Sequence, residues 1–79
     1  MAQVEHNFYC VTTDDANSLA KELELLGHKV VALEKDGPGF SLVTEESVEL
    51  AQATINAANL QALAEEFDAV YDGFNTAIE

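Results

Sequence analysis

The sequence contains no arginine and no tryptophan, and only one cysteine and one proline among its 79 residues. Without a second cysteine, no disulfide can form within the chain. His6 and His28 stand far apart in the sequence and far from Cys10, so no Cys/His spacing indicates a metal site. We therefore expect no metal and no cofactor. A domain this small buries only about 60% of the surface that its unfolded chain exposes, so core packing and backbone pairing must hold it together.

Positive charge is equally scarce. Lys21, Lys29 and Lys35 stand against 15 acidic residues, and the formal net charge is −12. A chain of this charge repels nucleic-acid phosphates and anionic lipids, and it has few groups that release counterions from them. We therefore predict no direct nucleic-acid binding and no membrane binding. The same field attracts a basic protein surface, so we predict a protein partner.

Long apolar runs are also missing. Residues Met1 to Glu5 have neither the basic start nor the apolar core of a signal peptide, and no stretch approaches the ~20 apolar residues of a membrane span. Together with a single unpaired cysteine, this predicts a cytoplasmic protein. The composition, 48% hydrophobic and 23% charged, predicts that residues 1–79 fold as one globular domain.

The first third of the chain reads as a strand followed by a helix. The β-rich run before Thr12 predicts a strand over about 5–12. Thr12 is then a helix N-cap, with Asp15 in the capping-box position. We predict a helix over about 13–26, which ends at Gly27 because glycine readily adopts the left-handed conformation. Its apolar stripe consists of Ala16, Leu19, Ala20, Leu23 and Leu26.

A hairpin follows the first helix. The apolar run within residues 28–35 predicts a second strand, and Asp36-Gly37-Pro38-Gly39 is a strong turn signal. A third strand begins at Phe40. We prefer to continue this strand to about residue 50, with a bulge near Glu45-Glu46, and to start a helix at about 53. The alternative is a helix that begins at Ser47.

The last third predicts a helix and a short strand. Alanine and leucine dominate the helix from Ile55 to Phe67, and both favour helix formation. Val70-Tyr71 predicts a short fourth strand, and Asp72-Gly73 predicts a turn. The resulting order, βαββαβ, predicts an α+β ferredoxin-like sandwich, in which two helices cover one face of a four-stranded antiparallel sheet. The buried stripe of the second helix is predicted to contain Ala57, Leu60, Leu63, Ala64 and Phe67.

The residues that could carry chemistry do not form a recognisable catalytic set. Cys10 lies within an apolar strand, which predicts a buried packing thiol rather than a nucleophile. His6 and His28 each stand at a strand start, which favours surface or strand-edge positions. Neighbouring acids point in different directions and therefore do not share a proton. No calcium-loop or phosphate-loop pattern is present. We predict that the protein is not an enzyme.

The C-terminal part contains the runs Leu63-Ala64-Glu65-Glu66-Phe67 and Tyr71-Asp72-Gly73-Phe74-Asn75-Thr76. These two runs resemble the signature of the ribonuclease E inhibitor family (regulator of ribonuclease activity B). Val11 to Asp15 and Leu26 to Val30 fit the strand-to-helix and helix-to-strand steps of that family, and the resemblance extends from about Asn7 to Thr76. Phe74 stands where the family has tryptophan, and Asn75 where glycine is common. The helical N-terminal extension and the acidic tail of longer members have no counterpart in these residues, so the resemblance covers the core domain.

The resemblance implies a cytoplasmic bacterial regulator that binds ribonuclease E, or another basic RNA-processing protein, and damps RNA degradation without cutting RNA. The non-catalytic regions of that endonuclease are rich in arginine, which suits an acidic partner. One alternative is a small-ligand sensor that acts as a homodimer. Another is an anti-nuclease protein whose acidic surface mimics nucleic acid. The partner-binding residues that we predict are Glu65, Glu66, Asp68, Tyr71, Asp72, Gly73 and Phe74.

Overall fold

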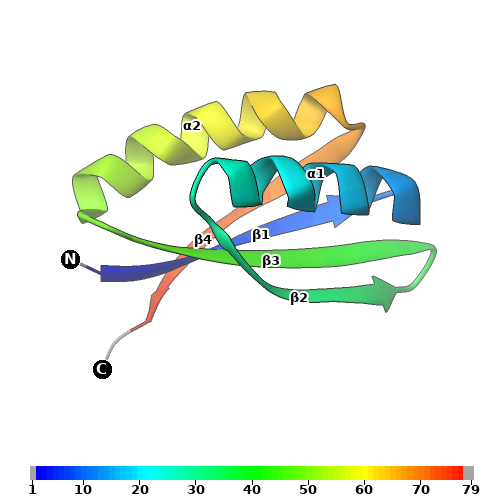
Figure 1. The fold of residues 1–79 in the computed structure, drawn as a ribbon, viewed down its shortest axis with the longest axis horizontal. Helices are drawn as coiled ribbons and strands as arrows, with labels where there is room; N and C mark the ends of the chain where they lie inside the picture. Colours follow the sequence, from blue (N-terminus) through cyan, green and yellow to red (C-terminus); the bar gives the residue numbers. More distant parts are fainter. Residues whose placement is uncertain (1, 78–79) are drawn as a thin grey trace.

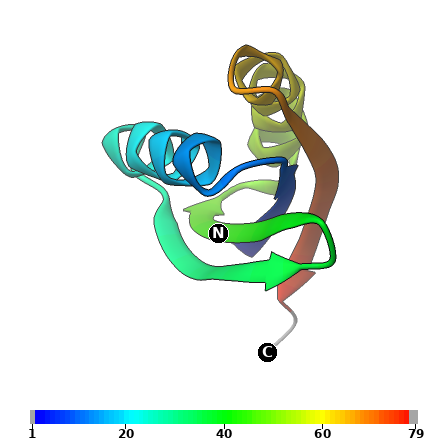
Figure 2. The same cartoon turned by 90° about the vertical axis from the view of Figure 1, so that its right-hand side faces the viewer.

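The computed structural model describes residues 2–77, which form four strands and two helices (Figure 1). The strands make one antiparallel sheet in the order β2-β3-β1-β4. Both helices lie on the same side of this sheet (Figure 2). This arrangement confirms the predicted α+β ferredoxin-like fold. In chain order the elements are β1 (Ala2–Cys10), α1 (Thr13–Leu25), β2 (Lys29–Asp36), β3 (Gly39–Val48), α2 (Leu50–Glu66) and β4 (Ala69–Ala77).

The pleat of the central strands divides the sheet into a covered face and an open face. Successive side chains of a strand point to opposite faces, and in β1 the even-numbered residues Val4, His6, Phe8 and Cys10 are all buried. The paired strand β3 follows the same parity, with Leu42 and Thr44 fully buried. The even positions of both strands therefore face the helices, and the odd positions face away from them.

Helix α1 begins as the sequence predicts and ends one residue earlier. The backbone N–H of Asp15 donates to the Thr12 hydroxyl at 3.1 Å, which confirms Thr12 as the N-cap. Gly27 has φ +96°, a left-handed conformation that glycine adopts without steric cost. The stripe from Ala16 to Leu23 is buried, but Leu26 is the C-cap residue and is largely exposed. Its assignment to the buried stripe was therefore wrong.

The ambiguous stretch resolves into a strand followed by a helix, as preferred, with both boundaries earlier than predicted. Strand β3 ends at Val48, Glu49 caps the helix, and α2 starts at Leu50. The alternative helix start at Ser47 is wrong. The bulge expected near Glu45-Glu46 is also wrong, because β3 pairs with β1 without a register shift there. The helix buries Ala53, Leu60 and Ala64 most deeply, whereas Leu63, Phe67 and Ala57 are only partly buried.

The turn predicted at Asp72-Gly73 is wrong, because both residues lie within strand β4. The strand runs through both residues, and its register with β1 shifts between the pairs Phe8–Tyr71 and His6–Phe74. Two residues of β4 therefore lie opposite one residue of β1, which is a β-bulge. Gly73 has φ +88°, which explains why a glycine stands there. Tyr71 is opposite Phe8 and Phe74 is opposite His6. Because the bulge adds one residue between them, both side chains face the helices.

The core lies between the sheet and the two helices. Cys10 is part of it and is fully buried, which confirms the predicted packing thiol. Burial, and to a smaller extent the charge of Asp15, raises the pKa of this thiol, so it remains protonated at neutral pH. The buried cluster contains Phe8, Cys10, Ala16, Leu19, Ala20, Leu23, Leu42, Leu60, Ala64 and Ala69.

The acidic side chains outside the core have few positive partners. Lys21, Lys29 and Lys35 form no ion pair with any residue in the 2–77 range that the structure describes. Within that range, both close contacts between a carboxylate and a histidine belong to Glu46. Most of the remaining acids are exposed. Their mutual repulsion opposes the compact state.

We therefore expect sodium chloride to stabilise the fold. Raising its concentration from about 0.01 M to about 1 M shortens the Debye length from ~30 Å to ~3 Å and screens the repulsion. A gain of about 1 kcal/mol corresponds to an increase of about 4–8 °C in Tm for a domain of this size. Thermal unfolding followed by circular dichroism measures the shift. A constant or falling Tm would show that the acids are compensated within the fold.

Candidate functional site

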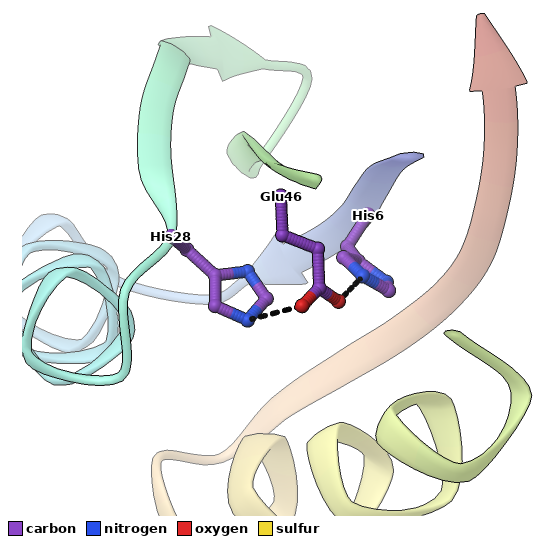
Figure 3. A group of neighbouring side chains, drawn as sticks. All are labelled: His6, His28 and Glu46. Carbon is purple, nitrogen blue, oxygen red and sulfur yellow. Dashed lines mark hydrogen bonds and ion pairs between the residues drawn. The ribbon is translucent and has the colours of Figure 1, made fainter. Parts of the chain in front are cut away.

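Two histidines and a glutamate meet under the helices, although they are far apart in the sequence. His6 comes from β1, Glu46 from β3, and His28 from the short connection between α1 and β2. Figure 3 shows the Glu46 carboxylate reaching between the two imidazole rings. We call these three residues the histidine–glutamate cluster.

The carboxylate of Glu46 is the centre of the cluster. Its Oε2 atom lies 2.5 Å from His6 Nε2, and its Oε1 atom lies 3.7 Å from His28 Nε2. The side-chain amide of Asn56, on α2, donates to Oε1 at 3.0 Å. Both imidazoles therefore present the same ring nitrogen, Nε2, to one carboxylate.

The other ring nitrogen of each histidine lies against a hydroxyl group. His6 Nδ1 is 2.8 Å from the Tyr71 hydroxyl, and His28 Nδ1 is 3.2 Å from Thr44 Oγ1. These contacts fix the rotation of both rings. As a result, each of the four ring nitrogens has a polar neighbour, either Glu46 or a hydroxyl group beside the cluster.

The strand registers explain why these residues meet. His6 is paired with Thr44 across β1 and β3, and Val30, two residues after His28, is paired with Thr44 from the other side. Glu46 is two residues beyond Thr44 and so shares its face. The even parity of β1 and β3 thus directs His6, Thr44 and Glu46 toward the helices, and the left-handed Gly27 turns the chain so that His28 follows.

The β4 bulge supplies the aromatic wall of the cluster. It directs Tyr71 and Phe74 to the same face, and the ring centroids of both lie 5.8 Å from that of His6. The His6 and His28 rings are themselves 5.3 Å apart. The Asp72-Gly73 step therefore acts through geometry, by placing two aromatic rings around one histidine.

Burial is what separates this cluster from an ordinary surface arrangement. His6 is 0% exposed and His28 8%, and the Glu46 side chain is 10% exposed. The prediction of surface or strand-edge histidines was therefore wrong. The sequence did carry a signal, because His6 and Glu46 share the parity of the apolar residues in their strands. A buried ionisable group must be paired or neutral, which makes such a cluster a candidate functional site.

The low polarity of the surroundings changes the ionisation of the cluster. Burial lowers the pKa of His28, an effect that the negative charge of Glu46 opposes and the neighbouring His6 reinforces. Burial, together with the charge of Glu46, raises the pKa of Tyr71 to about 12. His28 is therefore neutral at pH 7, and the Tyr71 hydroxyl keeps its proton.

The cluster offers metal ligands rather than a nucleophile. One ligand atom from each of His6, His28 and Glu46 can be chosen so that all lie within 4.8 Å of one another. A pocket of about 210 Å³ opens beside the cluster, lined by Leu26, His28, Glu46, Asn56, Asn59 and Leu60.

Comparison with known proteins identifies the family. The family model described as regulator of ribonuclease activity B matches residues 1–76. The chain belongs to this family. The match covers the signature from Leu63 to Thr76 and confirms the resemblance predicted from the sequence. A comparison with curated proteins gives no match.

The regulator of ribonuclease activity B family consists of regulators rather than catalysts, so a role in regulating ribonuclease activity follows for this chain. Within residues 2–77, neither helix has the length and apolar character needed to cross a membrane.

The residues predicted to bind a partner divide into two groups in this family member. Glu65 and Glu66, in the last turn of α2, are exposed. Asp68, just before β4, and Asp72, on β4, are exposed as well. Strand β4 forms one edge of the sheet. We call these four residues the α2–β4 acidic surface. The other three, Tyr71, Gly73 and Phe74, are partly buried and belong to the aromatic wall and bulge of the cluster.

Proposed function

We propose that this domain regulates RNA degradation in the cytoplasm as a non-catalytic binder of a basic RNA-processing protein, with ribonuclease E as the first partner to test. The observation that carries the proposal is the family match over residues 1–76. The net charge of −12 gives the partner its chemical character, because a polyanion associates with arginine-rich or lysine-rich protein segments.

We further propose the α2–β4 acidic surface as the contact region. The C-terminal end of a helix carries partial negative charge, so Glu65 and Glu66 are placed where acids are unfavourable. No basic residue stands in the last turn of α2 to offset them. Asp68 adds a third acid in a left-handed conformation with φ +53°. Acidic residues at a helix end where the dipole disfavours them support a role in contacting another protein.

The mechanism that fits these features is electrostatic competition. An arginine-rich segment that binds RNA also binds exposed carboxylates, and occupancy by the regulator excludes RNA from that segment. Edge strand β4 adds unpaired backbone groups next to the same acids. The regulator needs no catalytic group for this action.

Calorimetric titration with the arginine-rich region of ribonuclease E tests the proposal. We expect binding at low ionic strength that weakens as salt is added, since exposed charges are screened. Neutralising the contact acids should weaken binding at least about tenfold, the equivalent of about 1.4 kcal/mol. The variant carries Glu65→Gln, Glu66→Gln, Asp68→Asn and Asp72→Asn.

A matched control removes the same charge elsewhere on the domain. Its four sites are exposed, lie on α1 and β2, and do not belong to the α2–β4 acidic surface. We expect this control to retain most of the affinity. Equal losses in both variants would show that net charge alone attracts the partner and would reject the contact region. Absence of binding to the wild-type domain at low salt would reject the partner. The control carries Asp14→Asn, Glu24→Gln, Glu34→Gln and Asp36→Asn.

A further inference from the structure

We propose that His6, His28 and Glu46 form a zinc-binding site. The inference is independent of the partner proposed above, because it rests on the histidine–glutamate cluster and not on the exposed acids. Its ligands come from β1, from the α1–β2 connection and from β3, so a bound ion would tie together three segments of the fold.

The donor set selects the metal. Two imidazole nitrogens and one carboxylate oxygen are ligands that zinc accepts in a four-coordinate site. Calcium and magnesium prefer sites made of oxygen atoms and higher coordination numbers, which this buried cluster does not offer. Imidazole ligands also suit other transition ions such as copper and nickel. Zinc has no geometric preference from its d electrons, so it accepts the arrangement that two imidazoles and one carboxylate impose.

The outer contacts are those of a metal-binding histidine pair. A zinc-bound histidine usually donates its second ring N–H to a neighbouring oxygen, which sets the tautomer and orients the ring. Here the hydroxyl of Tyr71 lies 2.8 Å from His6 Nδ1, and that of Thr44 lies 3.2 Å from His28 Nδ1. With the protons on Nδ1, both Nε2 lone pairs point toward Glu46.

Small side-chain movements bring the cluster to coordination geometry. Zinc–ligand bonds of about 2.0–2.2 Å place tetrahedral ligand atoms about 3.3 Å apart. The distance from Glu46 Oε2 to His6 Nε2 is now 2.5 Å, and that from Oε1 to His28 Nε2 is 3.7 Å. One separation must therefore lengthen and the other shorten, each by less than about 1 Å. The ligand atoms of His6 and His28 lie within 4.8 Å of each other, so this third separation must close by at most about 1.5 Å.

The pocket beside the cluster provides the fourth position and the access route. His28 and Glu46 both line it, together with the amides of Asn56 and Asn59. Three protein ligands with a fourth site open to water or another small ligand are a common zinc arrangement. Asn56 already donates to Glu46 Oε1 at 3.0 Å, so it would hold the carboxylate in place.

The competing interpretation is a metal-free polar cluster held by hydrogen bonds. Among the described residues, no buried side-chain nitrogen or oxygen lacks a hydrogen-bond partner, so the cluster is also satisfied without an ion. In that state the short His6–Glu46 contact is a proton-mediated hydrogen bond. Zinc would occupy the place of that proton, and the two states can be distinguished by experiment.

Titration of the chelator-treated protein with zinc chloride provides the first test. Isothermal calorimetry should show one zinc ion per chain, and Tm should rise with zinc but not with the same concentration of magnesium. Glu46→Gln should weaken zinc binding at least tenfold. The matched control is Glu45→Gln, which removes the same charge one residue away on the opposite face of the sheet. Equal weakening in both variants would mean that zinc binds to surface carboxylates and would overturn the proposal.

Nuclear magnetic resonance of the wild-type protein provides a test that does not depend on a variant folding. Zinc should shift the Nε2 resonances of both histidines while their Nδ1 nitrogens remain protonated. Tyr71→Phe should reduce the affinity roughly 10–100-fold, because it removes the hydroxyl that orients His6. Unchanged histidine resonances at saturating zinc would overturn the site, whatever the calorimetry shows.

Discussion

Replacing Phe8 with alanine is expected to lower the free energy of unfolding by about 3–5 kcal/mol. Phe8 is only 2% exposed and lies on β1, which pairs with both β3 and β4. Its ring centroid is 5.2 Å from that of Tyr71. The substitution removes this contact and leaves a cavity under both helices. A domain of this size has a total stability of only about 4–12 kcal/mol, so the variant should be close to unfolding.

Urea denaturation followed by circular dichroism measures the loss. Ile55→Ala is the control, because Ile55 is an exposed residue of α2 and its truncation removes little buried surface. We expect a change within about 0.5 kcal/mol for that control. A loss below about 1 kcal/mol for Phe8→Ala would show that the sheet and helices do not pack around this ring as described.

Replacing Glu46 with alanine is expected to cost about 1–3 kcal/mol of stability, measured with a chelator so that no metal contributes. The substitution removes the acceptor next to His6 Nε2 and the acceptor of the Asn56 amide, and both groups are at least partly buried. A buried polar group left without a partner retains the penalty of losing its water. Urea denaturation again gives the value.

The control for this prediction is Glu45→Ala. Glu45 stands directly opposite Glu5 in the β1–β3 pairing and directly opposite Lys29 in the β2–β3 pairing, so a repulsion and an attraction of similar size are lost together. Removing Glu45 should therefore leave stability nearly unchanged. If both alanine variants lost the same stability, Glu46 would be an ordinary strand residue rather than the centre of a polar cluster.

Local signals in the sequence were sufficient for most of the fold. The N-cap Thr12 and the left-handed Gly27 mark the two ends of α1. Both could be predicted because capping and glycine conformation depend on only a few neighbouring residues. The β-rich run before Thr12 and the apolar residues from Phe40 onward identified β1 and β3 for the same reason. The predicted end of β3 is about two residues late and the predicted start of α2 about three residues late, because Glu49 caps the helix through its backbone and its side chain makes no cap hydrogen bond.

The Asp72-Gly73 step shows where local signals are ambiguous. A glycine with positive φ serves equally in a turn and in a β-bulge, so the dipeptide alone favours the commoner turn. Pairing with β1 over the length of β4 decides for the bulge. That pairing joins residues 59 to 74 positions apart, from Cys10–Ala69 to Gln3–Ala77, and no short sequence pattern specifies it.

The sequence by itself determined the scarcity of positive charge, the order of the elements and the family signature, because each depends on residue identity or short-range spacing. Only the tertiary structure decided that the two histidines and Glu46 meet. Whether a residue number is even or odd predicts which face of the sheet its side chain occupies. It does not predict which strands become neighbours. His6, His28 and Glu46 look like isolated polar residues along the chain. Antiparallel pairing of β1 with β3, and the turn after α1, bring them together out of water, where each needs the others as partners.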